Sequence, residues 1–290
     1  MSMTDDERAQ YERRLEFSGP WTPKRMAAAR PITAPSPAWM AEPEAPAPEI
    51  PGVYMTLPVN DPARNPYCRA GRLFCSQDGE DFFASACAIA RSGILTAAHT
   101  LFRNGKEITS AAYVPAYQDH NCPLGWWPVM KITVPDPWKQ SENYAYDYGF
   151  CLVGHNRNNK NDKQPLGDVT GIFGLAVDRT DIESWEALGY PGVPIKDYPF
   201  NGQRMWQCTG TNTMVDVTGQ ASKAGNLTRG ASGGPWLISD SDWVNGVESG
   251  DADQYPGQSF SPYFNRAVSA LYAKAFGHMP TGPTGPAPCP

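Results

Sequence analysis

Short apolar runs, each broken by Gly, Pro or Asn, are the feature that most constrains the fold of this 290-residue chain. They recur between about residue 52 and residue 276, at 82–83, 87–90, 93–95, 132–134, 150–153, 187–189, 236–238 and 243–244. Runs of this length and spacing favour short β-strands joined by turns, and they argue against alternating strands and long helices. We therefore expect an all-β core, built as a barrel or a sandwich.

Two stretches near the ends have helical spacing instead. Residues 4–17 combine the capping-box spacing of Thr4 and Glu7 with apolar residues four apart, which predicts a short helix. In residues 263–276, Phe264, Val268 and Leu271 recur at helical spacing, so this segment is expected to close the fold as a helix.

Composition also changes along the chain. Residues 31–51 are dense in Pro and Ala, which favours an extended, semi-rigid linker, and residues 280–290 are rich in Gly and Pro. We predict an N-terminal extension over residues 1–51, a folded domain over 52–278 and a flexible tail over 279–290.

Bulk properties argue against several classes of partner. The net charge of −6 offers no basic surface for nucleic acid or for an anionic membrane. No apolar stretch approaches the roughly 20 residues that a membrane-spanning helix needs. The acidic N-terminus lacks the apolar core of an ordinary signal peptide. We expect neither nucleic acid nor membrane as a partner, and either a cytoplasmic location or export by a non-standard route.

The cysteines are seven in number, so at least one thiol is unpaired. With no export signal, most of them are expected to be reduced and buried. They are Cys68, Cys75, Cys87, Cys122, Cys151, Cys208 and Cys289.

One serine, one histidine and one aspartate stand in contexts typical of catalytic groups. Ser232 lies in the run Gly-Ala-Ser-Gly-Gly, whose glycines let the backbone approach a substrate closely. His99 ends the run Thr-Ala-Ala-His after an apolar segment, and Asp147 precedes the apolar run 150–153. A serine hydroxyl needs an adjacent base, for which His99 is the candidate, with Asp147 to orient its ring. The chain order His, Asp, Ser is one of the orders known for a catalytic triad.

With these motifs in this order, the chain resembles the trypsin-like serine peptidases of the chymotrypsin fold, and among them the bacterial V8-like, or glutamyl-endopeptidase-like, branch. The matching motifs lie at 95–99, 147–149, 189–192, 231–235, 246–247 and 261–264. The resemblance implies two antiparallel six-stranded β-barrels, divided near residues 158–165, with the active site between them and a C-terminal helix. It also implies a monomer that cleaves protein or peptide substrates as a serine endopeptidase, with no cofactor and no metal.

The resemblance assigns further roles around the nucleophile. The backbone N–H groups of Gly230 and Ser232 are expected to form the oxyanion hole. Ala231 stands where trypsin-type zymogens have an aspartate that pairs with a newly cut N-terminus, so activation by that ion pair is not expected. Relatives often carry an N-terminal propeptide or strap, and we hypothesise that residues 1–50 restrain the active site until they are cleaved or displaced. A disordered leader is the alternative.

Specificity is expected to depend on the walls of the pocket for the P1 residue, the residue before the cleaved bond. By resemblance these walls are Asn226, Leu227, Thr228, Gly246, Val247, Glu248 and Ser249. Glutamate-specific relatives have a histidine at the place of Glu248. A glutamate there repels an acidic side chain, so we hypothesise a basic or neutral P1 residue. The alternative is that Glu248 points to solvent.

Other readings use the same residues. The run around Ser232 also fits the nucleophile elbow of an α/β-hydrolase esterase, with Asp251 or Asp253 and His278 as partners, but an elbow must lead into a helix. His120 and Cys122, with Cys151 and His155, have zinc-ligand chemistry at spacings of no standard zinc module. A catalytically silent, peptide-binding domain is the non-enzymatic alternative.

Overall fold

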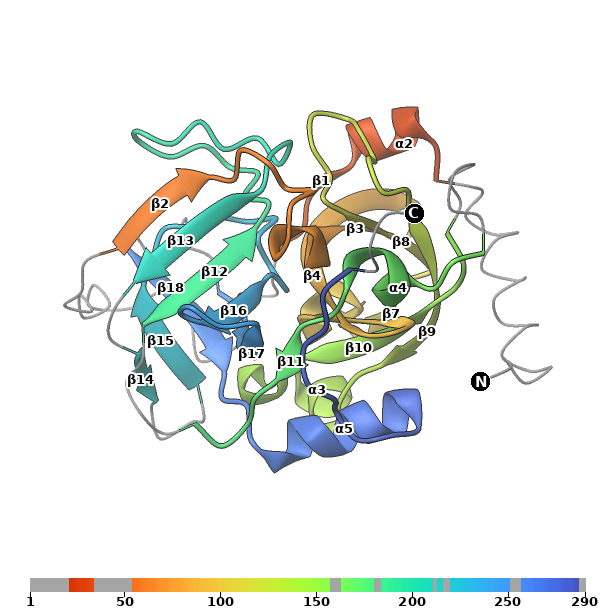
Figure 1. The fold of residues 1–290 in the computed structure, drawn as a ribbon, viewed down its shortest axis with the longest axis vertical. Helices are drawn as coiled ribbons and strands as arrows, with labels where there is room; N and C mark the ends of the chain where they lie inside the picture. Colours follow the sequence, from red (N-terminus) through yellow and green to blue (C-terminus); the bar gives the residue numbers. More distant parts are fainter. Residues whose placement is uncertain are drawn as a thin grey trace.

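The structure is a computed structural model that describes residues 21–33, 54–156, 163–179, 184–210, 213–215, 220–250 and 257–286 (Figure 1). It is mostly β, in two halves that follow one another along the chain (Figure 1). Within the described ranges, no helix combines the length and the apolar character that crossing a membrane requires. The predicted helix at 4–17 lies outside these ranges.

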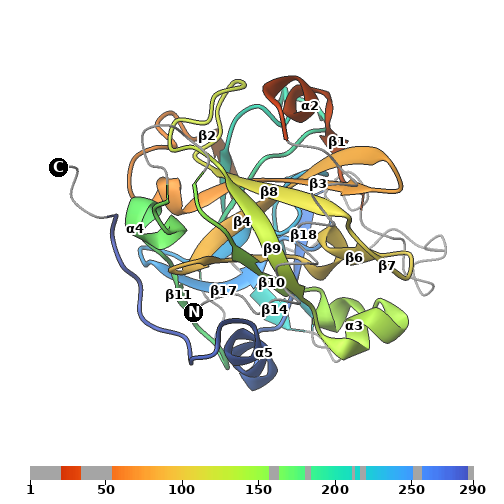
Figure 2. The ribbon, with the colours of Figure 1, turned by 90° about the vertical axis from the view of Figure 1, so that its right-hand side faces the viewer.

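The first half is a closed barrel. Six strands pair in the order β4-β3-β8-β9-β10-β5, and β5 pairs back onto β4 to close it. Figure 2 shows the strands of this barrel from another side. Most side chains of β3 and β4 are buried, because both faces of these strands pack on apolar layers. The strands are β3 (Ala70–Gln77), β4 (Glu80–Ala90), β5 (Gly93–Thr96), β8 (Ser110–Pro115), β9 (Trp127–Thr133) and β10 (Gly149–Val153).

An N-terminal segment packs onto this barrel. It comprises the helix α2 (Pro23–Ala28), whose first turn is capped by the Thr22 side chain, and the two-residue strand β1 (Arg30–Pro31). β1 pairs in parallel with β4, at the edge of the sheet. The side chains of Trp21, Met26 and Ile32 are buried. The sequence predicts an extended linker from residue 31, and the packing of residues 21–33 was not predicted.

The second half contains two sheets. A six-stranded sheet has the order β11-β17-β16-β12-β13-β2, and a three-stranded sheet has the order β14-β15-β18. β2 comes from the N-terminal side of the first barrel and crosses to pair with β13, which the apolar pattern did not reveal. The strands are β2 (Tyr54–Pro58), β11 (Gly174–Leu175), β12 (Trp185–Gly189), β13 (Trp206–Gly210), β14 (Thr213–Val215), β15 (Gln220–Ala224), β16 (Pro235–Ile238), β17 (Trp243–Val247) and β18 (Gln258–Pro262).

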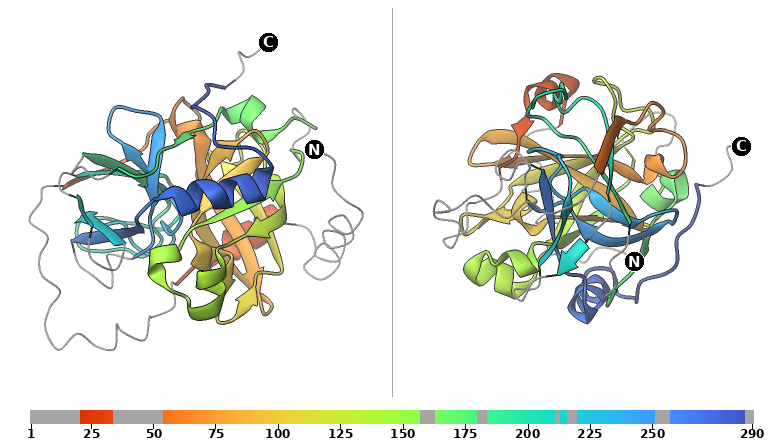
Figure 3. Two further views of the ribbon diagram at one scale, coloured as in Figure 1. Left: turned by 90° about the horizontal axis from the view of Figure 1, so that it is seen from below. Right: turned by 90° about the vertical axis from the view of Figure 1, so that its left-hand side faces the viewer.

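The helix α5 (Arg266–Phe276) confirms the predicted C-terminal helix. The Asn265 side chain caps its first turn, and Gly277 ends it in a left-handed conformation with φ of 78°. The helix follows the second half in sequence but packs on the first: Tyr272 and Phe276 contact Phe150 of β10, with ring centroids 5.5 and 5.7 Å apart. The left panel of Figure 3 shows α5 lying across the two halves.

Short elements and the chain's end complete the description. Two hydrogen bonds between Ile172 and Thr284 tie the described part of the tail to the body, where the composition predicts a flexible tail. The remaining elements are β6 (Phe102–Arg103), β7 (Lys106–Glu107), α3 (Asp136–Ser141), α4 (Leu166–Thr170) and the 3₁₀-helices η2 (Tyr67–Arg69), η3 (Ala98–Thr100) and η4 (Tyr144–Tyr146).

The described cysteines are all free thiols. Five of them are buried, as expected, and Cys122 is partly buried. Cys289 lies outside the described residues, as does most of the predicted boundary at 158–165.

Candidate active site

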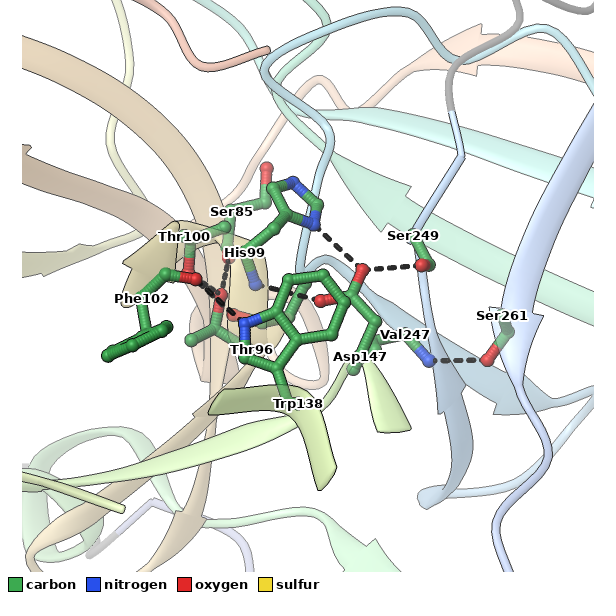
Figure 4. A network of polar contacts seen from close by, with 11 residues as sticks. Ser85, Thr96, His99, Thr100, Phe102, Trp138, Asp147, Val247, Ser249 and Ser261 are labelled. Carbon is green, nitrogen blue, oxygen red and sulfur yellow. Dashed lines mark hydrogen bonds and ion pairs between the residues drawn. The ribbon is translucent and has the colours of Figure 1, made fainter. Parts of the chain in front are cut away.

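His99 is positioned by the turn that follows β5. Thr96 ends the strand, and His99 lies in the 3₁₀-helix η3 immediately after it. The Thr100 hydroxyl donates to the carbonyl of Ala97 at 2.8 Å and lies 3.1 Å from the Thr96 hydroxyl, which stabilises the turn (Figure 4). The His99 side chain is fully buried.

Asp147 meets this histidine across the barrel. It lies between η4 and β10, and β10 pairs with β5 so that Gly149 is opposite Thr96. The Asp147 Oδ1 accepts from the backbone N–H of His99 at 2.8 Å, and Oδ2 lies 2.7 Å from His99 Nδ1 (Figure 4). Both side chains are fully buried, and a charge-assisted bond in such a site holds the ring in one orientation. The structure thus brings together the predicted base and its orienting carboxylate.

Ser249 makes a contact that was not predicted. The resemblance assigns it to the wall of the substrate pocket, and in the structure its hydroxyl donates to Asp147 Oδ2 at 2.5 Å (Figure 4). Three donors therefore converge on the two oxygens of Asp147. Because Ser249 lies two residues after the end of β17, this bond also joins the second half of the molecule to the first.

The nucleophile candidate lies in a turn with two glycines in the left-handed region. Gly230 has φ of 99° and Gly233 has φ of 82°. The Gly233 N–H donates to the carbonyl of Glu248, next to Ser249. There is no room for a side chain at Gly233, because a Cβ there would lie 2.0 Å from the Thr96 hydroxyl. The loop therefore lies directly against the turn that carries His99.

Ser85 of β4 fastens this loop, and the sequence analysis did not find it. Its N–H donates to the carbonyl of Ser232 at 2.8 Å, and its hydroxyl donates to the carbonyl of Gly230, also at 2.8 Å. The same hydroxyl accepts from the N–H of Tyr190 at 2.9 Å. A serine in a buried strand has no local pattern that announces such contacts, since all its partners are distant in sequence.

The second ring nitrogen of His99, Nε2, is not committed to Asp147. His99 Nε2 is buried and has no hydrogen-bond partner within the described ranges. With Nδ1 committed to Asp147, Nε2 is the nitrogen able to take and return a proton. Ser232 is fully buried as well.

The predicted pocket residues gather beside this loop, all of them buried. Asn226 Oδ1 accepts from the Thr56 hydroxyl at 2.5 Å, while its Nδ2 has no partner among the described residues. The Thr228 hydroxyl donates to the carbonyl of Val193 at 2.8 Å. Leu227 packs with Trp236 in an apolar cluster. The N–H of Val247 donates to the Ser261 hydroxyl, and Gly246 lies close to the same hydroxyl.

Glu248 does not point to solvent, so that alternative is wrong. Its side chain is fully buried, and its Oε2 accepts from Trp236 Nε1 at 2.7 Å. Burial raises the pKa of Glu248 to about 7, against the opposing pull of the Lys223 ammonium. Lys223 is itself fully buried, with its Nζ 4.9 Å from the Trp236 ring centroid and 3.4 Å from the carbonyl of Cys208. No local motif in the sequence marks this lysine.

The described residues do not favour the esterase and zinc-site alternatives. Pro235 opens the strand β16, whereas an α/β-hydrolase elbow leads into a helix. Asp251 and Asp253 lie outside the described ranges. Across the residues that are described, no group of three or more His, Cys, Asp or Glu side chains is placed to hold a metal ion.

Several solved structures that resemble this chain are proteases. The chain matches the protease Anisep from Arthrobacter nicotinovorans with a TM-score of 0.66 and 28% identity, over 78% of this chain and 100% of that chain. It matches AL20, a thermostable serine protease from an extremophilic microorganism, with a TM-score of 0.63 and 26% identity, over 72% of this chain and 96% of that chain. A Glu endopeptidase shares the fold at 17% identity and a TM-score of 0.63, over 77% of this chain and 97% of that chain. No family model and no curated protein sequence matches the chain. Its fold and its likeness to these enzymes make the chain a trypsin-like serine protease of the chymotrypsin fold.

Proposed function

We propose that the chain hydrolyses peptide bonds of protein or peptide substrates through a triad of His99, Asp147 and Ser232. The observation that carries the proposal is the buried His99–Asp147 pair, which leaves Nε2 of the same ring available. Ser232 Oγ attacks the carbonyl carbon while Nε2 takes its proton, and Nε2 then gives that proton to the leaving amine. Water, deprotonated by the same nitrogen, cleaves the resulting ester and regenerates the serine.

The loop geometry supports an oxyanion hole made by the N–H groups of Gly230 and Ser232. Ser85 holds the carbonyls of these two residues, which orients the peptide units that follow each of them and so restricts the turn that carries the two N–H groups. Donors set in advance stabilise the developing oxyanion, and losing one typically costs about 10²–10³ in rate.

The finer architecture proposed is a second barrel facing the first. Two hydrogen bonds from the end of β17 and the residues after it to β18 support it: Val247 N–H donates to the Ser261 hydroxyl at 2.9 Å, and Ser249 N–H donates to the carbonyl of Phe260 at 2.8 Å. These links join the six-stranded and three-stranded sheets of the second half, and a monomer of two such barrels suffices to assemble the site.

A fluorophosphonate probe tests the proposed chemistry on the full chain, because it reacts with serines that are activated by a base and an oxyanion hole. Labelling at Ser232 supports the proposal. Absence of labelling in a folded sample contradicts it and leaves the peptide-binding domain as the better account.

For specificity we propose that Glu248 lines the P1 pocket and disfavours an acidic P1 residue. Above about pH 7, where Glu248 is ionised, its carboxylate balances the buried Lys223 ammonium, so the pocket favours neutral or basic side chains. In a library of peptides that differ only at P1, we expect little cleavage after Glu. The variant Glu248→Gln leaves Lys223 unbalanced, and we expect cleavage after Glu, relative to Gln, to rise about tenfold. Preferred cleavage after Glu by the natural chain would contradict the assignment.

The raised pKa of Glu248 also makes stability depend on pH. The unfolded chain releases this proton near 4.5, whereas the folded chain holds it until about pH 7. The unfolded state therefore binds fewer protons between these values, and stability is lost as pH rises through this window. Relative to the parent, we expect the free energy of unfolding of Glu248→Gln to increase as pH rises from 4.5 to 7, by roughly 3 kcal/mol at most. Above pH 7 the difference between the two chains should stay constant.

Urea unfolding at pH 5 and pH 8 measures this difference, with Ser232→Ala in both chains to prevent self-cleavage. Glu142→Gln, at a half-buried position, is the matched control and should show the same difference at both pH values. If the difference in unfolding free energy between Glu248→Gln and the parent were also the same at pH 5 and pH 8, the raised pKa of the buried Glu248 carboxyl would be contradicted.

A further inference from the structure

We infer that residues 21–33, which we call the N-terminal strap, occupy the sheet edge that the leaving-group half of a bound peptide needs. The strap thereby regulates access to the active site. This inference rests on the proposed function, because it concerns which parts of a peptide substrate the site admits.

The edge of β4 is divided among three neighbours. Its first part pairs with β1, so that Arg30 is opposite Phe82 and Pro31 opposite Phe83. Two residues further along, the N–H of Ser85 holds the carbonyl of Ser232. The last part pairs with β5. The strap and the nucleophile thus share one strand edge, separated by about 7 Å of strand.

The strap runs toward Ser85 and packs beside Gly192, whose N–H donates to the carbonyl of Arg229 in the nucleophile loop. β1 is parallel to β4, and the N–H of Ile32 donates to the carbonyl of Phe83 at 2.9 Å. Pro31 lies beside Gly192, where a Cβ would be 3.0 Å from Pro31 Cβ and 3.3 Å from the carbonyl oxygen of Arg229. Arg229 immediately precedes the oxyanion glycine.

This edge and the proposed P1 pocket approach the nucleophile loop from different elements. The pocket residues come from the segment before the nucleophile and from β17, whereas Ser85 and Phe83 flank the loop from β4. A peptide whose P1 side chain enters that pocket continues, after the cleaved bond, toward β4. An extended peptide gains affinity by adding a strand to an exposed edge. Here the carbonyl of Phe83 is already taken by the strap.

The strap is held by polar anchors as well as by buried side chains. Arg25 binds both oxygens of Asp81, at 2.6 and 2.8 Å, and the Ser76 hydroxyl at 2.5 Å. Its guanidinium lies 4.1 Å from the Trp21 ring centroid, and Trp21 Nε1 donates to the Ser110 hydroxyl at 3.1 Å. Because the Arg25–Asp81 pair is only partly exposed and bidentate, it is the contact whose reversal should loosen the strap most selectively. Figures 1 and 2 show α2 and β1 together at one end of the first barrel.

The test compares two substrates that share the residues before the cleaved bond. One is an anilide with nothing beyond that bond, and the other is an internally quenched peptide with four further residues. In the full-length variant Arg25→Asp, which sets two carboxylates against each other, we expect kcat/KM for the long peptide to rise about fivefold. The anilide, which does not reach the strap, should change less than twofold. Hydrogen exchange at the Ile32 amide should rise in the same variant, since its bond to Phe83 opens.

Two further variants separate regulation from simple damage. Arg25→Asp combined with Asp81→Arg restores the ion pair and should return the long peptide to the parental rate. Arg91→Asp, which breaks the exposed bidentate pair with Asp168, is the matched control and should leave both substrates unchanged. An unchanged ratio of the two substrates in Arg25→Asp overturns the inference, even with normal labelling of Ser232. Loss of labelling in the parent chain would overturn the proposed function instead.

Discussion

Replacing Ser232 with alanine is expected to abolish peptide hydrolysis and fluorophosphonate labelling together. The change removes the one oxygen that forms the acyl bond, while Ser85 still holds the backbone of the loop. Losing the nucleophile of a triad lowers kcat by about 10⁶-fold. The activity that remains comes from substrate binding and the oxyanion hole. Hydrolysis of a quenched peptide and gel-based labelling measure the two effects.

Ser141→Ala is the matched control for this experiment. Ser141 is exposed at the end of α3, where its hydroxyl donates only to the carbonyl of Pro137 among the described residues. It should leave both readouts at the parental level. If Ser232→Ala retained peptide hydrolysis, the assignment of the nucleophile would fail. If the parent chain were never labelled by the fluorophosphonate, and Ser232→Ala still bound peptide, a catalytically silent, peptide-binding domain would be favoured.

The second large effect is expected from Asp147→Asn. Asp147 accepts three hydrogen bonds, from His99 N–H, from His99 Nδ1 and from Ser249. An amide of the same shape has one acceptor oxygen and one NH₂ group, so one donor must face another unless the imidazole changes tautomer. That tautomer carries its proton on Nε2, which can then no longer accept one from Ser232. We expect kcat to fall about 10⁴-fold.

Asp136→Asn controls for loss of an acidic side chain nearby in the sequence, since Asp136 is exposed in the first turn of α3. Thermal melting accompanies the kinetics of both variants. A parental kcat in Asp147→Asn, with an unchanged melt, would contradict the orienting role. A melt lowered in proportion to activity would point to a structural role alone.

Much of the fold was predictable where apolar runs are local. The runs at 87–90, 93–95 and 150–153 all lie in strands of the first barrel, and the helical spacing after residue 263 corresponds to α5. These signals depend on residues that are neighbours in sequence, so a single chain displays them.

Long-range pairing was not predictable in the same way. β2 reads as a strand only because β13 offers it an edge, and the strap reads as a linker until the edge of β4 is in place. The run Ala-Ser-Lys-Ala that contains Lys223 looks like an exposed strand, yet the lysine is fully buried near Glu248. Tertiary context decided each of these, and no local pattern records it.

The same limit applied to the candidate site. The three proposed triad residues stand in local motifs, so the sequence could suggest them, and the structure pairs two of them. Ser85 has no motif, and the resemblance suggested only a pocket-wall role for Ser249. Its contact with Asp147 is set by how the two halves meet.

The helix α5 helps to hold the two halves of the molecule together. It belongs to the chain of the second half and is fastened by Tyr272 and Phe276 to Phe150 of β10, three residues from Asp147. The bond from Ser249 to Asp147 requires the two halves to stay together, and α5 is one of the elements that hold them, besides the bonds from Ser85 to the nucleophile loop. An inhibitor that spans both halves should therefore also stabilise the packing of this helix, which is remote from the chemistry, because a ligand that binds only the joined halves favours them.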